Sequence, residues 1–90
     1  MNNARRKAIA ALQARLEEAL NALDGVVSDV AALQQEEQDA FDNLSEGLQQ
    51  SERGQQSEAA AEALEEAAQA VDAALERLQE AIDTLTTAAE

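Results

Sequence analysis

Several residue types that most small domains use are missing from this chain. It contains no cysteine, histidine, proline, tryptophan or tyrosine, and Phe41 is its only aromatic residue. Without cysteine no disulfide can form. A conventional globular core is excluded, because large aromatic side chains contribute much of the buried area in such cores. Basic residues are scarce too: 6 Lys and Arg stand against 19 Asp and Glu, a formal net charge of −13 in 90 residues. A chain of this length forms one small domain at most.

The residues that are abundant favour helices. Hydrophobic residues make up 46% of the chain, and Ala, Leu, Glu, Gln and Arg are strong helix formers. Disorder is the alternative that the net charge suggests, but the aliphatic residues recur too regularly for a disordered chain. No stretch approaches the ~18 apolar residues of a membrane span, and an amphipathic stretch follows the basic start, unlike a signal peptide. We therefore expect an all-α protein located in the cytoplasm.

The first half of the chain carries a heptad pattern, in which steps of four and three residues alternate. Its positions are Leu12, Leu16, Ala19, Leu23, Val26, Val30, Leu33, Glu37, Ala40 and Leu44. Leu20, Val27 and Phe41 lie one position to the side and widen the apolar stripe. The pattern predicts one long helix over about 3–42. Gly25 lies inside it at a cost of roughly 1 kcal/mol relative to Ala, so two helices broken at Gly25 are the alternative.

The second half repeats the alternation. Its positions are Ser57, Ala61, Leu64, Ala68, Val71, Leu75, Leu78, Ile82, Leu85 and Ala89. They predict a helix over about 52–87, with Ser51 as its N-cap. Residues 43–51 form the expected elbow, in which Asn43 and Ser45 are further caps, and Leu44 and Leu48 close the end of the helix pair. The two helices have similar lengths, so we expect a single domain, 1–90, folded as a long antiparallel hairpin of the coiled-coil type.

The wide stripe of the first helix needs a second apolar surface, because a hairpin gives each helix only one neighbour. A homodimer that forms an antiparallel four-helix bundle is the simplest solution. We expect the self-association seam to contain Leu12, Leu16, Leu20, Leu23, Val27, Val30, Leu64, Val71, Leu75, Leu78, Ile82 and Leu85.

Charge is distributed unevenly along the chain. The first fifteen residues hold Arg5, Arg6, Lys7 and Arg15, whereas residues 16–90 hold all 19 carboxylates and two bases, a balance of −17. Binding to nucleic acid or to an anionic membrane is disfavoured, because both need clustered basic residues. A basic protein surface is the expected partner. The alternative is that the carboxylates only solvate the outer faces of the helices.

The groups that enzymes use are absent or misplaced. There is no His or Cys, and Lys7, the single lysine, lies in a charged terminal cluster. No calcium-binding or phosphate-binding loop is present. We expect no enzymatic activity, no metal and no cofactor. Glu37 falls on the seam, where a buried carboxylate needs a partner. Arg53 is a candidate for that partner, and the pair would set the register of the helices.

Residues 41–54 resemble a known pattern. The stretch Phe41-Asp42-Asn43-Leu44-Ser45-Glu46-Gly47-Leu48-Gln49-Gln50-Ser51-Glu52-Arg53-Gly54 is similar to the central motif of short, acidic, uncharacterised bacteriophage and prophage proteins. In those proteins it joins two Glu- and Leu-rich helices. One departure is Ser45, where the family often has Pro, which would preset the first turn of the elbow. The resemblance implies a helical hairpin of phage type that acts in the host cytoplasm. It implies no particular activity.

Two functions follow as hypotheses. In the first, the chain inhibits a host or defence factor by covering a basic, nucleic-acid-binding surface, since a rod of carboxylates can occupy such a cleft. Specificity would then come from elbow residues, namely Phe41, Asn43, Leu44, Gln49, Gln50, Glu52 and Arg53. The competing interpretation is that these residues only cap helices, plug the core or form ion pairs. In the second hypothesis the chain is a structural or assembly coiled-coil protein with no host target.

Overall fold

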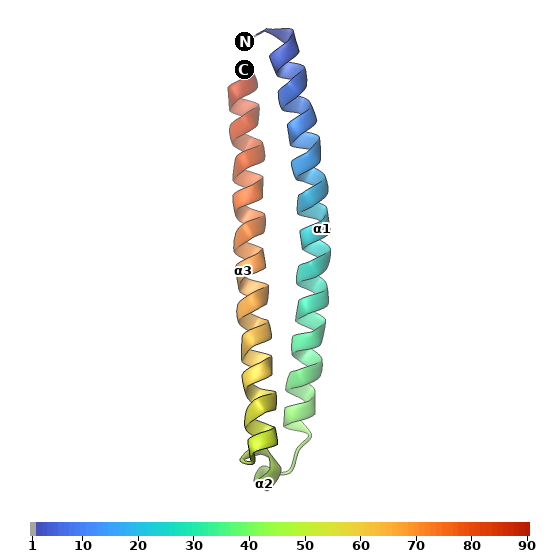
Figure 1. Cartoon of the computed structure of the whole chain (residues 1–90), viewed down its shortest axis with the longest axis vertical. Coiled ribbons are helices and arrows are strands. Elements are labelled where there is room, and N and C mark those ends of the chain that lie inside the picture. The colour runs from blue at the N-terminus through green and yellow to red at the C-terminus, as the bar shows by residue number, and fades with distance from the viewer. Residues whose placement is uncertain (1) are drawn as a thin grey trace.

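The computed structural model describes residues 2–90, and all regular structure in that range is helical. In chain order, α1 spans Asn3–Asp42, α2 spans Glu46–Gln49 and α3 spans Glu52–Ala89. Figure 1 shows α1 and α3 side by side, with both chain ends at one end of the molecule and α2 at the other. The molecule measures 68 × 15 × 13 Å between Cα atoms along its principal axes. The predicted all-α helical hairpin is therefore confirmed.

The N-terminal ends of the three helices are capped by side chains. The Asn2 side chain accepts a hydrogen bond from the Arg5 N–H at the start of α1. Ser45 caps α2 and Ser51 caps α3, each accepting from the N–H three residues on. Such caps satisfy N–H groups that have no partner within the helix. Helix α1 runs unbroken through Gly25, and α3 ends at Ala89, two residues beyond the expected end.

The seam of α3 lies at the expected positions, but the seam of α1 is shifted. Leu12, Ala19, Val26, Leu33 and Ala40 were expected inside and are exposed. The residues that follow each of them are partly buried instead, namely Gln13, Leu20, Val27, Gln34 and Phe41. A two-helix hairpin can bury only one edge of the wide stripe. The edge that it buries carries Phe41, the largest apolar side chain of α1, where the other edge has Ala40.

Few side chains are well buried. Within residues 2–90 the buried apolar residues are Ile9, Ala61 and Ile82, which remain 9%, 2% and 7% exposed. The rest of the seam is half-buried, because two helices cover each other on one side only. The hairpin thus leaves much of its apolar surface without a partner.

Besides the hydrogen bond of 3.0 Å from Arg6 Nε to the Ala89 carbonyl, two side-chain contacts tie α1 to α3 near the ends of the seam. Gln13 Nε2 donates to the Ile82 carbonyl at 3.0 Å and to Thr86 Oγ1 at 2.8 Å. Toward the elbow, the Ser57 hydroxyl donates to Glu37 Oε1 at 2.6 Å. Side-chain contacts between specific atoms are sensitive to a shift of one helix along the other, so these two help to fix the register.

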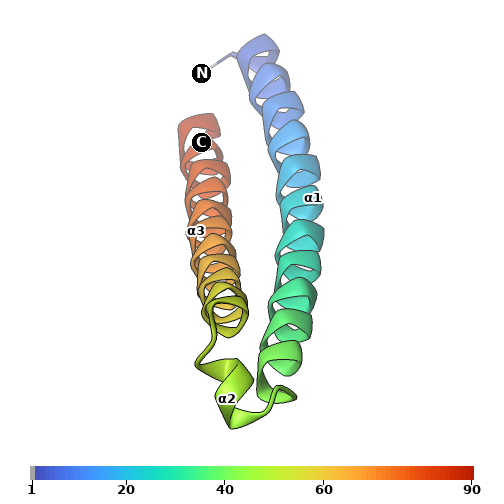
Figure 2. The ribbon, with the colours of Figure 1, turned by 60° about the horizontal axis from the view of Figure 1, so that its bottom comes forward.

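The elbow brings backbone segments very close together. Figure 2 shows the short helix α2 linking the ends of α1 and α3. Gln49 Nε2 donates to the Phe41 carbonyl at 3.1 Å, which ties α2 to the end of α1. Gly54, in the first turn of α3, is buried, and a Cβ atom there would overlap the carbonyl oxygens of Leu48 and Gln49. Glycine is therefore required at this position by close backbone approach.

Candidate functional site

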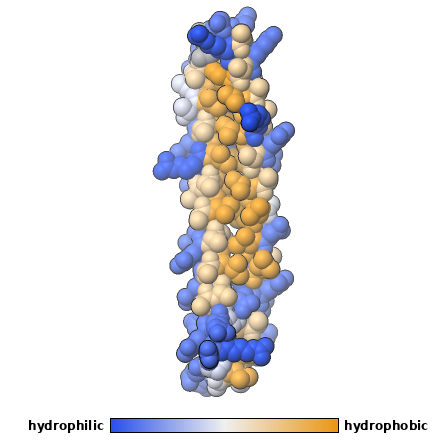
Figure 3. Space-filling model, viewed as in Figure 1, coloured by the Kyte–Doolittle hydropathy of each residue, from blue (hydrophilic) through white to orange (hydrophobic). Residues whose placement is uncertain are grey.

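One flank of the hairpin is apolar along most of its length. It consists of residues spaced by seven along each long helix, which places them on one stripe of a coiled-coil helix. All ten are exposed, and together we call them the apolar face: Leu12, Ala19, Val26, Leu33 and Ala40 on α1, and Ala60, Ala67, Ala74, Ala81 and Ala88 on α3. Figure 3 shows the corresponding hydrophobic band running lengthwise between polar edges.

Both stripes lie on the same side of the hairpin because of helix direction. Each member of the apolar face directly precedes a seam residue, as Leu12 precedes Gln13 and Ala60 precedes Ala61. In two antiparallel helices, equivalent flanking positions meet on the same side of the pair. A shallow pocket there is lined by Leu12, Arg15, Leu16, Ala19 and Leu85, residues of both helices. The two stripes therefore form one surface.

The largest side chains of this face are substantially exposed. Leu12 is 45% exposed, Val26 43% and Leu33 53%. Burying such a side chain fully is worth about 1.5–3 kcal/mol, and contiguous exposed apolar patches usually mark interaction sites. Alanine along α3 adds no bulk, so another helix can approach its backbone closely. The apolar face therefore has the exposure and composition that are typical of an interaction surface.

The opposite flank has the reverse character. There, the residues directly after seam positions include five exposed carboxylates, which we call the acidic flank: Glu17, Asp24, Glu58, Glu65 and Asp72. None of the ten positions of the apolar face carries a charge. One flank therefore carries the uncharged apolar face, and the other carries five carboxylates together with small or polar residues such as Ala10 and Ala31.

Some of the elbow residues singled out in the sequence are partly buried in the hairpin, and the others are exposed on its surface. Phe41, Leu44 and Gln49 are half-buried, and Gln49 holds the Phe41 carbonyl. Asn43, Gln50, Glu52 and Arg53 are exposed. Leu48, expected to close the end of the helix pair together with Leu44, is 52% exposed instead.

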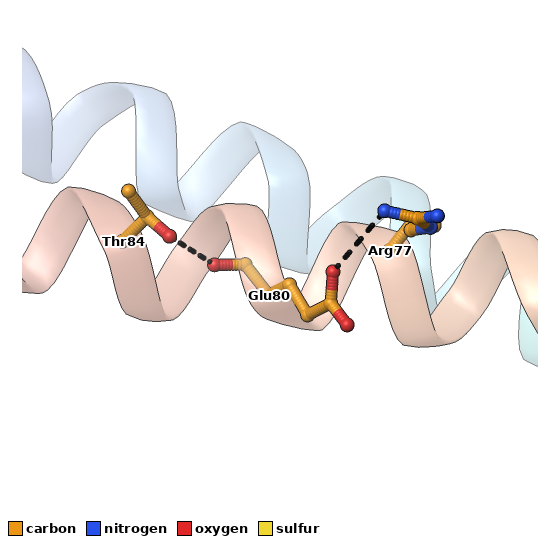
Figure 4. A network of polar contacts seen from close by, with 3 residues as sticks. All are labelled: Arg77, Glu80 and Thr84. Carbon is orange, nitrogen blue, oxygen red and sulfur yellow. Dashed lines mark hydrogen bonds and ion pairs between the residues drawn. The ribbon is translucent and has the colours of Figure 1, made fainter.

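Glu37 is paired differently from the sequence expectation. Its half-buried carboxylate accepts from Ser57, and no ion pair links it to Arg53, although both residues line one pocket with Ala40 and Leu44. Within residues 2–90 the single ion pair is Arg77 to Glu80, with 3.7 Å between Nη1 and Oε2, on the surface of α3. Figure 4 shows this pair beside Thr84, whose hydroxyl donates to the Glu80 carbonyl. An exposed pair of this kind adds little stability.

Most residues of the expected self-association seam lie within the hairpin itself. Leu12 is on the apolar face, but the others are half-buried or buried between α1 and α3: Leu16, Leu20, Leu23, Val27, Val30, Leu64, Val71, Leu75, Leu78, Ile82 and Leu85. Sequence reasoning missed the alanine stripe of α3. The available signal was five alanines at seven-residue spacing, each directly before a seam residue.

Within residues 2–90, no three acidic side chains come together in a group that could hold a metal ion. None of the helices in that range combines the length and apolar character needed to cross a bilayer. The fold and its two flanks thus define a class of molecule: an elongated α-helical hairpin with one apolar and one acidic side. Comparisons with protein-family models, curated proteins and solved structures found no match to the chain.

Proposed function

We propose that this chain is a non-catalytic helical binding protein. Two copies pair through their apolar faces into a four-helix bundle, and the acidic exterior of the bundle covers a basic surface on another protein. The observation that carries the proposal is the contrast between an uncharged, exposed apolar face on one flank of the rod and five exposed carboxylates on the other. One flank serves association with a second copy, and the other remains free for a partner.

Pairing would concentrate negative charge on the outside. Each chain has a formal net charge of −13, so a dimer carries twice that, −26. Carboxylates on a rigid rod attract a positively charged surface over a distance and speed the encounter. A surface that binds nucleic acid is the natural target, because its basic groups are arranged for a line of phosphates.

The resemblance of residues 41–54 to phage proteins supports a phage-type role for this binding protein. A phage-type inhibitor of a host or defence factor would act in the host cytoplasm by covering a surface, and this requires no cofactor and no reaction. Asn43, Gln50, Glu52 and Arg53 are exposed at the elbow and could add specificity at one end of the rod.

Affinity capture from a bacterial lysate tests the proposal. We expect the chain to recover a basic partner at low salt and to lose it at high salt, because screening weakens charge–charge attraction. A variant of the acidic flank, Glu58→Gln/Glu65→Gln/Asp72→Asn, should capture less of that partner while self-associating as before. Equal capture by this variant and the original chain would contradict the role of the acidic flank.

The second candidate is a structural or assembly protein without a host target. The observation that favours it is that Phe41, Leu44 and Gln49 at the elbow are half-buried and serve the fold. The apolar face alone would then account for the function. Self-association in the absence of any partner captured at low salt would favour this second candidate over the first.

A further inference from the structure

We infer that the occupant of the apolar face is a second copy of this chain in antiparallel orientation, with α1 packed on α1 and α3 packed on α3 of the second copy. The inference rests on the proposed self-association and specifies its geometry. Two copies that bury the same long face against each other along its whole length are related by a two-fold axis in the interface. The axis runs either along the rod, giving a parallel dimer, or across it, giving an antiparallel one.

The spacing of the apolar face suits an axis across the rod. On α1, an axis midway between Ala19 and Val26 exchanges these two residues, and it also exchanges Leu12 with Leu33. On α3, an axis at Ala74 exchanges Ala67 with Ala81 and Ala60 with Ala88. The axis on α3 relates all five members of its stripe, and the axis on α1 relates the first four, with Ala40 opposite Arg5 of the second copy.

The two centres lie at nearly the same height on the rod. Gln13 contacts Ile82 and Glu37 contacts Ser57, so the residue numbers at equal height sum to 94 or 95. Ala74 is then level with residues 20–21, about two residues from the midpoint between Ala19 and Val26. At 1.5 Å per residue this offset is about 3 Å. One axis can therefore serve both helices.

Charge favours the same orientation. The start of α1 carries Arg5, Arg6, Lys7 and Arg15, and its elbow end carries Glu36, Glu37, Asp39 and Asp42. In the antiparallel dimer, where α1 packs on α1, the basic start of one copy lies beside the acidic end of the other. A parallel dimer would instead place the two acidic elbow ends together, which is destabilising.

Arg15 extends this charge complementarity to the border of the proposed dimer interface. It borders the apolar face in the pocket formed with Leu12, Leu16, Ala19 and Leu85. Asp29 occupies the equivalent outer position two heptads later. The axis midway between Ala19 and Val26 brings Arg15 of one copy within one residue of the height of Asp29 of the other.

The area is large enough for a stable dimer. A rectangle of the two larger molecular dimensions, 68 × 15 Å, covers about 1,000 Å² in each copy. Covering it on both copies removes about 2,000 Å² from water, whereas stable interfaces bury about 1,200–2,000 Å² in total.

The first arm of the test measures self-association by sedimentation equilibrium. We expect a dimer whose dissociation constant rises at least about 100-fold in the Leu12→Gln/Leu33→Gln variant, because four large apolar side chains per dimer are lost from the interface. The matched control is Ala10→Gln/Ala31→Gln, which has the same spacing on the opposite flank of α1, where both residues are exposed. Circular dichroism checks that both variants stay helical.

The second arm tests orientation by disulfide cross-linking, which is unambiguous because the chain has no cysteine of its own. Under oxidation, the Ala74→Cys variant should form disulfide dimers, because position 74 lies on the axis. Ala60→Cys alone should not, but it should cross-link when mixed with Ala88→Cys. A dimer in which Ala74→Cys fails to cross-link, while a mixture of Ala19→Cys and Ala74→Cys does, would overturn the antiparallel geometry and keep the self-association. A monomer at all concentrations would overturn both.

Discussion

At the residue scale, the three glycines differ in how an added methyl group should change the stability of the hairpin. Gly54 is buried under the elbow, where a Cβ would overlap the carbonyl oxygens of Leu48 and Gln49. Gly25 lies in the exposed middle of α1, and beyond its own helical turn no atom lies within 4 Å of the place that a Cβ would take. Gly47, in α2, has equally open surroundings. Only at position 54 does packing decide which residue can stand there.

We expect Gly54→Ala to destabilise the hairpin by about 1–3 kcal/mol, the usual cost of forcing extra volume into a filled site. The backbone of the elbow must move to accept it, because the opposing atoms belong to the main chain and not to a flexible side chain. Urea unfolding followed by circular dichroism at fixed protein concentration measures the change. An unchanged midpoint would mean that the elbow is looser than these contacts indicate.

The matched control is Gly25→Ala, for which we expect the reverse sign. Alanine is favoured over glycine inside a helix by about 1 kcal/mol, partly because it restricts the unfolded chain. Since nothing near Gly25 opposes a methyl group, the full gain should appear in the same urea experiment. A loss of stability there would indicate that α1 bends at this position in solution.

At the scale of elements, the two long helices differ in how well the sequence predicts them. The seam of α3 follows from the sequence because a single apolar stripe is present, bordered by alanine and acidic residues. The stripe of α1 is wider, so the choice between Leu12 and Gln13, or between Leu33 and Gln34, depends on what α3 presents. That is a tertiary effect, and the period of one helix cannot reveal it.

The candidate site was only partly predictable for the same reason. Leu12 was expected at a self-association surface and is exposed on the apolar face. The alanines of α3 were not expected there, because alanine is common on any helix surface and carries little information about burial. Their significance becomes visible only when α1 sets Val26 and Leu33 beside them on the same flank.

A double-mutant cycle can measure how strongly the two helices are held in register. Gln13 Nε2 donates to both Thr86 Oγ1 and the Ile82 carbonyl, and the Thr86 hydroxyl lies within 3.2 Å of that same carbonyl. We expect Gln13→Ala and Thr86→Val to be coupled by about 0.5–1.5 kcal/mol, the usual contribution of one such hydrogen bond. Chemical unfolding of the two single variants and the double variant gives the value. Strict additivity would show that this contact does not hold the register in solution.

At the scale of the whole molecule, charge works against the compact state. The formal net charge is −13, and within residues 2–90 the only ion pair joins Arg77 to Glu80. Carboxylates along a rod 68 Å long repel one another with little local compensation. Salt at about 0.15 M reduces such interactions beyond a Debye length of about 8 Å. Repulsion and its screening therefore bear on both folding and pairing.

We expect the melting temperature to rise with salt, because screening relieves repulsion in the folded hairpin more than in the expanded unfolded chain. Between about 0.02 M and 0.5 M NaCl a gain of about 1 kcal/mol corresponds to roughly 4–8 °C for a domain of this size. Calorimetry at constant protein concentration measures it, and the acidic-flank variant, with three fewer charges, should gain less.

Capture of a basic partner should respond to the same salt in the opposite direction, since attraction between unlike charges is screened too. A melting temperature that falls with salt would mean that attractive pairs outweigh repulsion. Charge repulsion would then no longer be a reason to expect that this acidic chain needs pairing through its uncharged apolar face for stability.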